Sequence, residues 1–341
     1  MESVSEGNQT DDTLIIVSCG IVITWILSVV TVFGNSLVIL AFITEKSLRS
    51  NPAYLFILNL SIADFLTGAF SFPLNTLWLM FDYWPFGEGV CKMWLIIDYT
   101  ACAVSVCGII LISLDRYWML KLKLKYRQFQ TTKRVTVMIL VSWAVLIPFY
   151  AIPTLFWEKF KGEQIIDYSE DCEMESEQSL AYNLVIVFVE FLIPLPIIVY
   201  FNIIVYREIR SRSRTRPSHN ISQSVTHGCD STISTAVAFS VTSENPRNML
   251  KKHRKAAVTL GALVIAFAIC WTPYNIVLIW SIVCDDCLSD TLWEVVNYLL
   301  WTNSAINPFL YALTNLKIRE CYYKLLGVNY FRKSTRIIQV H

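Results

Sequence analysis

Seven long apolar stretches constrain this chain more than any other feature. They cover residues 14–43, 53–80, 90–119, 135–157, 180–206, 256–283 and 291–314. Each reaches the roughly 20 residues that a helix needs to cross the apolar core of a bilayer. The composition agrees, because 55% of the residues are hydrophobic and only 16% are charged, against about 45–50% and 25% in soluble domains. The sequence therefore predicts an all-α membrane protein, a bundle of seven transmembrane helices.

Prolines lie inside at least four of these stretches, at Pro148, Pro194, Pro273 and Pro308. In water an internal proline breaks a helix because it lacks an N–H and crowds the preceding turn. Membrane helices tolerate it, since neighbouring helices satisfy the freed carbonyls. We expect irregular helices here rather than chain breaks.

Basic residues set the orientation. No Lys or Arg precedes Lys46, and only Lys92, Lys159 and Lys161 fall in the predicted outer segments. The other Lys and Arg residues gather in alternate loops, at 44–52, 121–134, 207–216, 247–255 and 317–336. Because cytoplasmic loops carry the excess of Lys and Arg, we expect a multi-pass protein of the plasma membrane with an extracellular N-terminus.

The predicted organisation has three parts. Residues 1–13 form an extracellular tail, in which Asn8-Gln9-Thr10 is a glycosylation sequon. Residues 14–315 form the seven-helix domain, with a flexible third intracellular loop at 211–250 that is rich in Ser and Thr. Residues 316–341 form the cytoplasmic tail. Its first part alternates basic and apolar residues at helical spacing, which predicts a short amphipathic helix on the inner leaflet.

Four cysteines lie on the predicted outer side, in oxidising surroundings: Cys91, Cys172, Cys284 and Cys287. We expect the disulfides Cys91–Cys172 and Cys284–Cys287. A zinc site is the alternative for the second pair, although no second ligand pair accompanies it. Cys321 follows the last span and is a candidate for palmitoylation.

The outer loops are acidic, chiefly in the segments 158–177 and 285–294. Two interpretations remain open. The acids either keep exposed loops soluble or concentrate a cationic ligand at the mouth of the bundle.

Ionisable residues at membrane depth are costly and mark function. Asp98 lies two helical turns beyond Cys91, which suits a counter-ion for an amine that enters from outside. A structural ion pair is the alternative, but no Lys or Arg lies at comparable depth in another span. Aromatic faces attract ammonium groups, and four aromatic residues are candidates to line the same pocket, unless they serve packing alone: Tyr99, Trp271, Tyr274 and Trp301.

Glu190 is a second deep acid, one turn before Pro194. It implies a ligand with two basic or donor ends, or a protonated carboxyl that donates a hydrogen bond. The alternative is a polar residue satisfied at a helix interface.

Asp64 is the third deep acid, and polar residues of other spans lie at a similar depth: Asn35, Ser105, Asn303, Ser304 and Asn307. Together they suit an oxygen-rich site for a small hard cation such as sodium. A hydrogen-bond network that holds the helices is the alternative. At the inner end, Arg116 follows Asp115, which we expect to neutralise it in a resting state.

These residues fall in motifs that resemble a rhodopsin-like G-protein-coupled receptor from the first span to residue 327. The motifs follow in order: Gly34-Asn35, Leu58 to Asp64, Trp84-x-Phe86-Gly87, Cys91 with Cys172, Asp115-Arg116-Tyr117, Trp143, Pro194, Cys270-Trp271-x-Pro273-Tyr274 and Asn307-Pro308-x-x-Tyr311. The resemblance implies a heterotrimeric G protein as partner, together with arrestin and receptor kinases. It also implies roles in activation and coupling for Asp115, Arg116, Tyr117, Asn202, Pro273, Asn307, Pro308 and Tyr311.

Within that family, Asp98 resembles the amine-binding acid of biogenic-amine receptors. The chain looks most like the type-3 and type-4 histamine receptors, on the strength of Glu190, Cys102, Asn202 and Trp301. This resemblance implies that Asp98 binds the ammonium of histamine, that Glu190 binds its imidazole, and that the G protein is of the Gi/o class. Trp271 would form the floor of the pocket.

Some features favour another interpretation. The run from Trp271 to Asn275 resembles muscarinic acetylcholine receptors, in which an Asn like Asn275 meets the ligand. Lys123 stands where a Pro or a small apolar residue is usual, which fits a decoy receptor that binds without coupling. His253 replaces the acid that would pair with Arg116, and we expect raised basal activity.

Other classes fit less well. A transporter would show repeat symmetry and discontinuous helices, and neither is evident. The chain carries no hydrolytic triad, metal motif or phosphate loop, so we expect neither an enzyme nor a tightly bound cofactor beyond an allosteric sodium ion. We expect membrane lipid, and no nucleic acid, among its partners.

Overall fold

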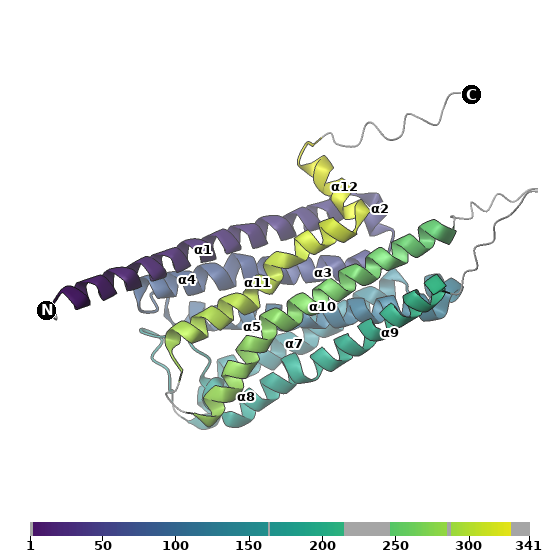
Figure 1. Cartoon of the computed structure of the whole chain (residues 1–341). Coiled ribbons are helices and arrows are strands. Elements are labelled where there is room, and N and C mark those ends of the chain that lie inside the picture. Colours follow the sequence, from purple (N-terminus) through teal and green to yellow (C-terminus); the bar gives the residue numbers. More distant parts are fainter. Residues whose placement is uncertain (1–2, 163, 215–245, 285–287, 329–341) are drawn as a thin grey trace, which may run out of the picture.

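The computed structural model describes residues 3–162, 164–214, 246–284 and 288–328. In these ranges the chain is helical apart from its turns and loops. The long elements run side by side (Figure 1), and their bounds are α1 Ser3–Thr44, α3 Ala53–Leu66, α4 Phe72–Phe81, α5 Gly87–Leu122, α7 Thr132–Lys161, α8 Leu180–Val187, α9 Pro194–Arg214, α10 Pro246–Val283 and α11 Asp290–Thr314. The predicted all-α bundle is confirmed.

Short elements join and interrupt them. They are α2 Lys46–Arg49, the π-helical turn η1 Thr67–Ser71, η2 Lys123–Lys125, α6 Tyr126–Phe129, η3 Glu175–Gln178, the π-helical turn η4 Phe188–Leu192 and α12 Leu316–Leu325. The spans therefore comprise α1, α3–η1–α4, α5, α7, α8–η4–α9, α10 and α11.

Six of these spans, within the described residues, are long and apolar enough to cross a membrane. The seventh, α11, is more polar because Asn297, Asn303 and Asn307 lie along it. It packs against α1 and α10, and both Asn303 and Asn307 are buried. The polar side chains of α11 thus face the protein, as expected where lipid cannot satisfy them.

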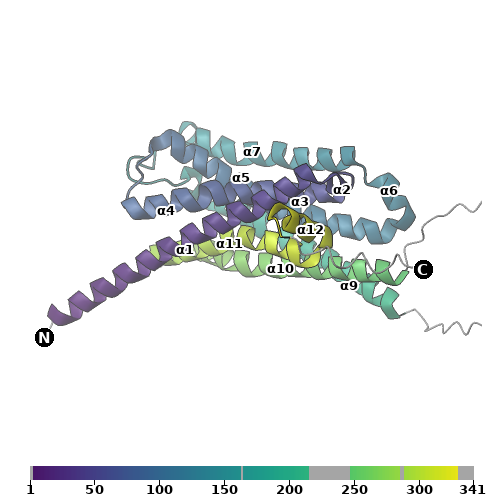
Figure 2. The same ribbon diagram turned by 90° about the horizontal axis from the view of Figure 1, so that it is seen from above.

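The central element is α5. Seen from above (Figure 2), α7 lies along one side of the bundle and α10 and α11 lie along the other, with α3 and α5 between them. Helix α5 packs against α3, α7 and α9. Residues of α5 are therefore best placed to meet side chains from several spans.

The expected proline effects are visible. α7 continues through Pro148, α10 through Pro273 and α11 through Pro308. In the fifth span the chain instead forms η4 immediately before Pro194, and the N–H of Ile193 donates to the carbonyl of Phe188 at 3.0 Å. Pro194 has no N–H to offer the carbonyl of Glu190, four residues earlier. The extra residue in this turn re-aims the Glu190 side chain.

The amphipathic helix is present as α12. Asn315 caps it, accepting from the N–H groups of Lys317 and Ile318 at 3.1 and 3.5 Å. Ile318 and Cys321 are buried against the bundle, and α12 turns sharply away from the axis of α11 (Figure 1). The thiol of Cys321 is free but buried, a placement that does not favour the expected palmitoylation.

Three predictions lie outside the described residues or side chains. They concern the glycosylation of Asn8, the side chain of His253 and most of the loop at 211–250. Cys284 is disulfide-bonded, whereas its expected partner Cys287 lies outside the described residues. Among the described residues no cluster of His, Cys, Asp and Glu could hold a metal ion.

Candidate functional site

Asp98 lies on the inner face of α5, near the outer end of the bundle. Its carboxylate is 3.9 Å from the thiol of Cys102, one turn further along α5, and Ser71 and Trp301 lie close to it. It retains accessible surface although Leu95 and Thr100, on either side, are buried. Among the described side chains Asp98 forms no ion pair with Lys or Arg, so the structural ion pair weighed from the sequence is not observed there.

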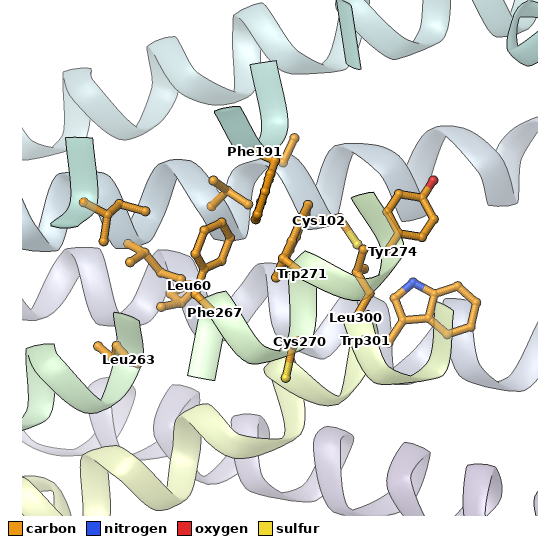
Figure 3. Close-up of a cluster of buried hydrophobic side chains, with 14 of the residues drawn as sticks. Leu60, Cys102, Phe191, Leu263, Phe267, Cys270, Trp271, Tyr274, Leu300 and Trp301 are labelled. Carbon is orange, nitrogen blue, oxygen red and sulfur yellow. The ribbon is translucent and has the colours of Figure 1, made fainter. Parts of the chain in front are cut away.

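Aromatic rings from α4, α10 and α11 gather in this part of the bundle. Trp301 meets Phe72 edge-on, and both pack against Tyr298, with centroids 5.6–6.1 Å apart. Figure 3 shows Cys102, Trp271, Tyr274 and Trp301 gathered in one region from α5, α10 and α11. Trp271 packs on Phe267 at 5.3 Å. The structure therefore brings together most of the residues predicted to line the pocket.

Glu190 also points into the bundle, where it meets a residue that the sequence analysis did not single out. The phenol of Tyr150, on α7, donates a hydrogen bond to the Glu190 carboxylate. Both side chains are buried, at 0% and 4% exposure. The ring of Tyr150 in turn stacks on Tyr99, with centroids 5.7 Å apart. Glu190 is thus a satisfied polar residue and, at the same time, part of the wall around Asp98.

Glu177, on the outer loop, is a third acid at this site. The phenol of Tyr99, the residue after Asp98, donates to the Glu177 carboxylate. Burial raises the pKa of Glu177 to about 7, and the negative charges of Glu173 and Asp98 act in the same direction. In the sequence Glu177 is one of the acids of the loop segment 158–177. Its position five residues after Cys172, which is tied to α5, is the feature that could have indicated its place beside Asp98.

The disulfide explains how a loop residue reaches so deep. Cys91 and Cys172 are bonded, with their Cα atoms 5.6 Å apart, as predicted. The bond holds the loop against the start of α5. The motif around Trp84 adds a second tie, because the Trp84 N–H donates to the carbonyl of Glu170 at 2.6 Å and its ring stacks on Trp94 at 5.2 Å.

Asn275 lies near these residues but is engaged within its own helix. Its side-chain amide donates to the carbonyl of Trp271 at 2.9 Å, and the residue is 2% exposed. A contact with a ligand would require the amide to leave this bond. The geometry leaves the muscarinic-like interpretation open.

Deeper in the bundle, Asp64 joins three spans. It accepts hydrogen bonds from Ser105 on α5 at 3.2 Å and from Asn307 on α11 at 2.8 Å, and Ser304 lies close to it. The side-chain oxygens of Asn303 and Asn307 are buried without a hydrogen-bond partner in the described part of the chain. Asn35 instead ties α1 to α11, donating to the carbonyl of Ser304 at 3.2 Å. Unsatisfied oxygens beside a carboxylate fit a small hard cation.

At the inner end the structure departs from expectation. Asp115 is buried and accepts from Tyr126 at 2.7 Å and from Gln130 at 2.9 Å. Arg116 contacts Met119 at 3.9 Å, and the ion pairs of the described residues do not join it to Asp115. Among the described residues Arg116 and Asp115 form no direct ion pair, although Arg116 lies within electrostatic range of Asp115. The hydrogen bonds to Asp115 come from the loop after α5.

The other residues expected to act in activation occupy the same half of the bundle. Asn202 on α9 donates to Ser113 on α5 at 3.3 Å, and Tyr117 packs against Phe201 at 5.3 Å. Tyr311 is buried, and its hydroxyl has no hydrogen-bond partner among the described residues. The bond between Asn202 and Ser113 joins α9 to α5, so relative motion of these two helices would break it.

The described helices form a bundle that gathers acids and aromatic rings near one end and carries Asp115-Arg116-Tyr117 near the other. Residues 34–311 match the 7 transmembrane receptor (rhodopsin family). The chain belongs to this family, and as a receptor it is not an enzyme.

Individual relatives show which receptors of this family the chain is similar to. The chain is 26% identical over 416 residues to the muscarinic acetylcholine receptor M1 of Homo sapiens, with 92% of this chain and 90% of the relative covered. It is 30% identical to the probable G-protein coupled receptor No18 of Amphibalanus amphitrite (87% and 86% covered). It is 27% identical to the 5-hydroxytryptamine receptor 1B of Vulpes vulpes (88% and 84% covered). The chain is therefore similar to aminergic receptors.

Proposed function

We propose that this receptor binds a small cationic amine between Asp98 and Glu190 and activates a heterotrimeric G protein. The relatives support the ligand class, since two of them are named for acetylcholine and 5-hydroxytryptamine, and both of those ligands carry a cationic nitrogen. The single observation that carries the proposal is Asp98, an acid inside the bundle with aromatic neighbours and no ion-pair partner among the described side chains.

Histamine is the amine that we propose. Its ammonium suits Asp98, and its imidazole can exchange hydrogen bonds with Glu190 or Tyr150, which already form a donor and acceptor pair. Acetylcholine has no N–H to offer a second acid, so it leaves Glu190 unused. Glu190 is therefore the residue that distinguishes the two candidates.

The mechanism that we propose is a shift in population between two arrangements of the inner helix ends. An agonist that binds the open arrangement more tightly increases its share. Opening α9 and α10 beside Arg116 would admit the G protein, for which we propose the Gi/o class. In the same account Asp64, Ser105, Asn303, Ser304 and Asn307 hold sodium in the closed arrangement, and the N-terminus lies outside the plasma membrane.

Competition binding on membranes tests the pocket. Histamine and acetylcholine would be measured on wild type, Asp98→Asn and Glu190→Gln, with Asp82→Asn at an exposed outer position as the matched control. We expect both pocket changes to weaken histamine tenfold or more, about 1.4 kcal/mol, and the control to be silent. Binding of acetylcholine with a silent Glu190→Gln would favour the muscarinic-like alternative.

Coupling needs its own test. We expect histamine to accelerate nucleotide exchange on Gi/o in membranes that hold the receptor, and Arg116→Ala to abolish this without loss of binding. Histamine binding without exchange on any G protein would identify a decoy receptor instead.

A further inference from the structure

Glu177 brings a third carboxylate to the proposed amine pocket, from outside the bundle. The backbone around it is packed firmly, because Met174, Glu175 and Ser176 are buried and the side chain of Asn183 donates to the Glu177 carbonyl at 2.8 Å. Other acids of the same loop, such as Glu173 and Asp167, are exposed. Glu177 therefore differs from the solubilising acids of the loop in both position and surroundings.

The three acids of the pocket are not equivalent. Glu177 accepts from the phenol of Tyr99 and Glu190 from the phenol of Tyr150, and these two rings stack on each other. Asp98 has a weak contact with the Cys102 thiol at 3.9 Å and lies close to Ser71 and Trp301, but among the described residues no phenol donates to it. The phenol of Tyr274 lies within electrostatic range of all three carboxylates. Ionised acids this close repel one another. A ligand with one positive charge therefore leaves negative charge unbalanced, which a second positive charge would neutralise.

Tyr99 shows where a second positive group of a ligand could bind, next to Glu177. This residue is next to Asp98 on α5, and its hydroxyl reaches Glu177, so one tyrosine side chain spans the distance between the two acids. A planar guanidinium would fit this second place, since it offers paired N–H donors to a carboxylate and stacks on aromatic rings.

We propose that Glu177 is a specificity-determining residue that makes this pocket select amines with a second full positive charge over amines with one. This inference rests on the proposed function, because it requires Asp98 to bind the ammonium group of the ligand. Dications of the amino-guanidine class are the ligands that it favours. Histamine satisfies the same requirement when its imidazole takes up a proton in the pocket.

Two probes of similar size separate the two kinds of amine. Agmatine carries an ammonium and a guanidinium, whereas 2-phenylethylamine carries an ammonium and a neutral ring. Their inhibition constants against labelled histamine would be measured on wild type, Glu177→Gln and Asp171→Asn, the last removing the same charge from an exposed position on the same loop. We expect Glu177→Gln to weaken agmatine tenfold or more and 2-phenylethylamine less than threefold, and Asp171→Asn to change neither.

Equal weakening of both probes by Glu177→Gln, or of neither, would overturn the proposal. Glu177→Asp retains the charge and should restore most of the preference for agmatine, which a merely structural role of Glu177 would not predict. Surface labelling of every variant confirms that the compared proteins are folded and exported.

A second readout separates this inference from the proposed function. Stabilisation of the detergent-solubilised receptor against heat by each probe needs no labelled histamine. If histamine fails to bind while agmatine stabilises wild type more than Glu177→Gln, the selection of dications stands and the histamine assignment fails. If histamine binds in an Asp98-dependent way while Glu177→Gln treats both probes as wild type does, the proposed function stands and this inference fails.

Discussion

The two glutamates of the pocket differ in how their charges are accommodated. Glu190 is buried beside Pro194 within the membrane, whereas Glu177 lies in the loop above it and keeps contact with water. The pKa of Glu177 is about 7, against an ordinary value of 4.5. It therefore titrates near physiological pH.

The first prediction concerns this titration. Between about pH 4.5 and 7 the folded receptor keeps the Glu177 proton that the unfolded chain has lost, so stability falls as the pH rises through this window. We expect Glu177→Gln to remove this part of the fall and to raise the thermal midpoint at pH 8 by roughly 2 °C. The groups that face Glu177 and set this behaviour are Tyr99, Asp98, Glu173, Tyr182, Glu190 and Tyr274.

Thermal scans of wild type and Glu177→Gln at several pH values between 5 and 8 provide the measurement. Asp171→Asn serves as the control, because that residue is exposed on the same loop. Parallel curves for wild type and Glu177→Gln would contradict the prediction.

Tyr150 carries the second prediction. Tyr150→Phe removes the only described donor to Glu190 and leaves that carboxyl buried without it. We expect a loss of about 2 kcal/mol of stability, together with weaker binding of histamine. Tyr200→Phe is the matched control, since Tyr200 is 60% exposed. The measurement is the thermal unfolding midpoint of each variant. An unchanged midpoint for Tyr150→Phe would show that Glu190 has another donor.

At the scale of the element, the π-helical turn η4 determines where Glu190 points. The turn exists because Pro194 cannot donate to the carbonyl of Glu190, and the next donor, Ile193, reaches back to Phe188. Such turns are rare within helices and occur often at functional sites.

The third prediction follows from that turn. Pro194→Ala supplies the missing N–H and allows a regular helix, which would turn Glu190 away from Tyr150. We expect histamine affinity to fall tenfold or more while the thermal midpoint stays level or rises. Pro148→Ala is the control, because α7 is regular at that proline and Pro148 has no part in the pocket. A large loss of stability in Pro194→Ala with unchanged affinity would contradict this account.

At the scale of the whole molecule, two polar regions link the helices. Asp64 joins α3, α5 and α11 through Ser105 and Asn307, and Asp115 joins α5 to the loop that follows it. Buried polar networks of this kind are costly to leave partly satisfied. In the proposed mechanism, these networks rearrange when the bundle passes between its two arrangements.

The fourth prediction tests the sodium site. We expect sodium to weaken histamine binding severalfold in wild type compared with a large organic cation at equal ionic strength. Asp64→Asn should abolish the difference, since it removes the charge that holds the ion while it retains the polar shape. Asp82→Asn provides the control at an exposed position. A sodium effect that persists in Asp64→Asn would exclude Asp64 as its origin.

The fifth prediction concerns basal activity. Helix α10 carries His253 near its cytoplasmic end, in place of an acid. Arg116 contacts Met119 rather than a described acid. We expect nucleotide exchange without ligand to exceed that of empty membranes, and His253→Glu to lower it. Basal exchange equal to that of empty membranes would sink the prediction.

Much of the fold was readable in the sequence because a bilayer leaves a chain few choices. Apolar length predicts each span, basic loops predict the orientation, and Cys91 and Cys172 are the outer cysteines that the structure joins. The depth of Asp98 followed from helical rise alone. These are properties of single elements, and they depend on local composition and spacing.

The pocket could be predicted only in part, because its remaining members meet through tertiary packing. Glu177 looked like any other loop acid until the disulfide and Tyr99 placed it over α5. Tyr150 looked like one more interfacial aromatic until η4 turned Glu190 toward it. The sequence by itself predicted which residues form the apolar spans and how far along each span the acids lie. Only the tertiary structure decided which of them share a space, since hydrogen bonds between elements depend on rotations and loop paths that no local pattern records.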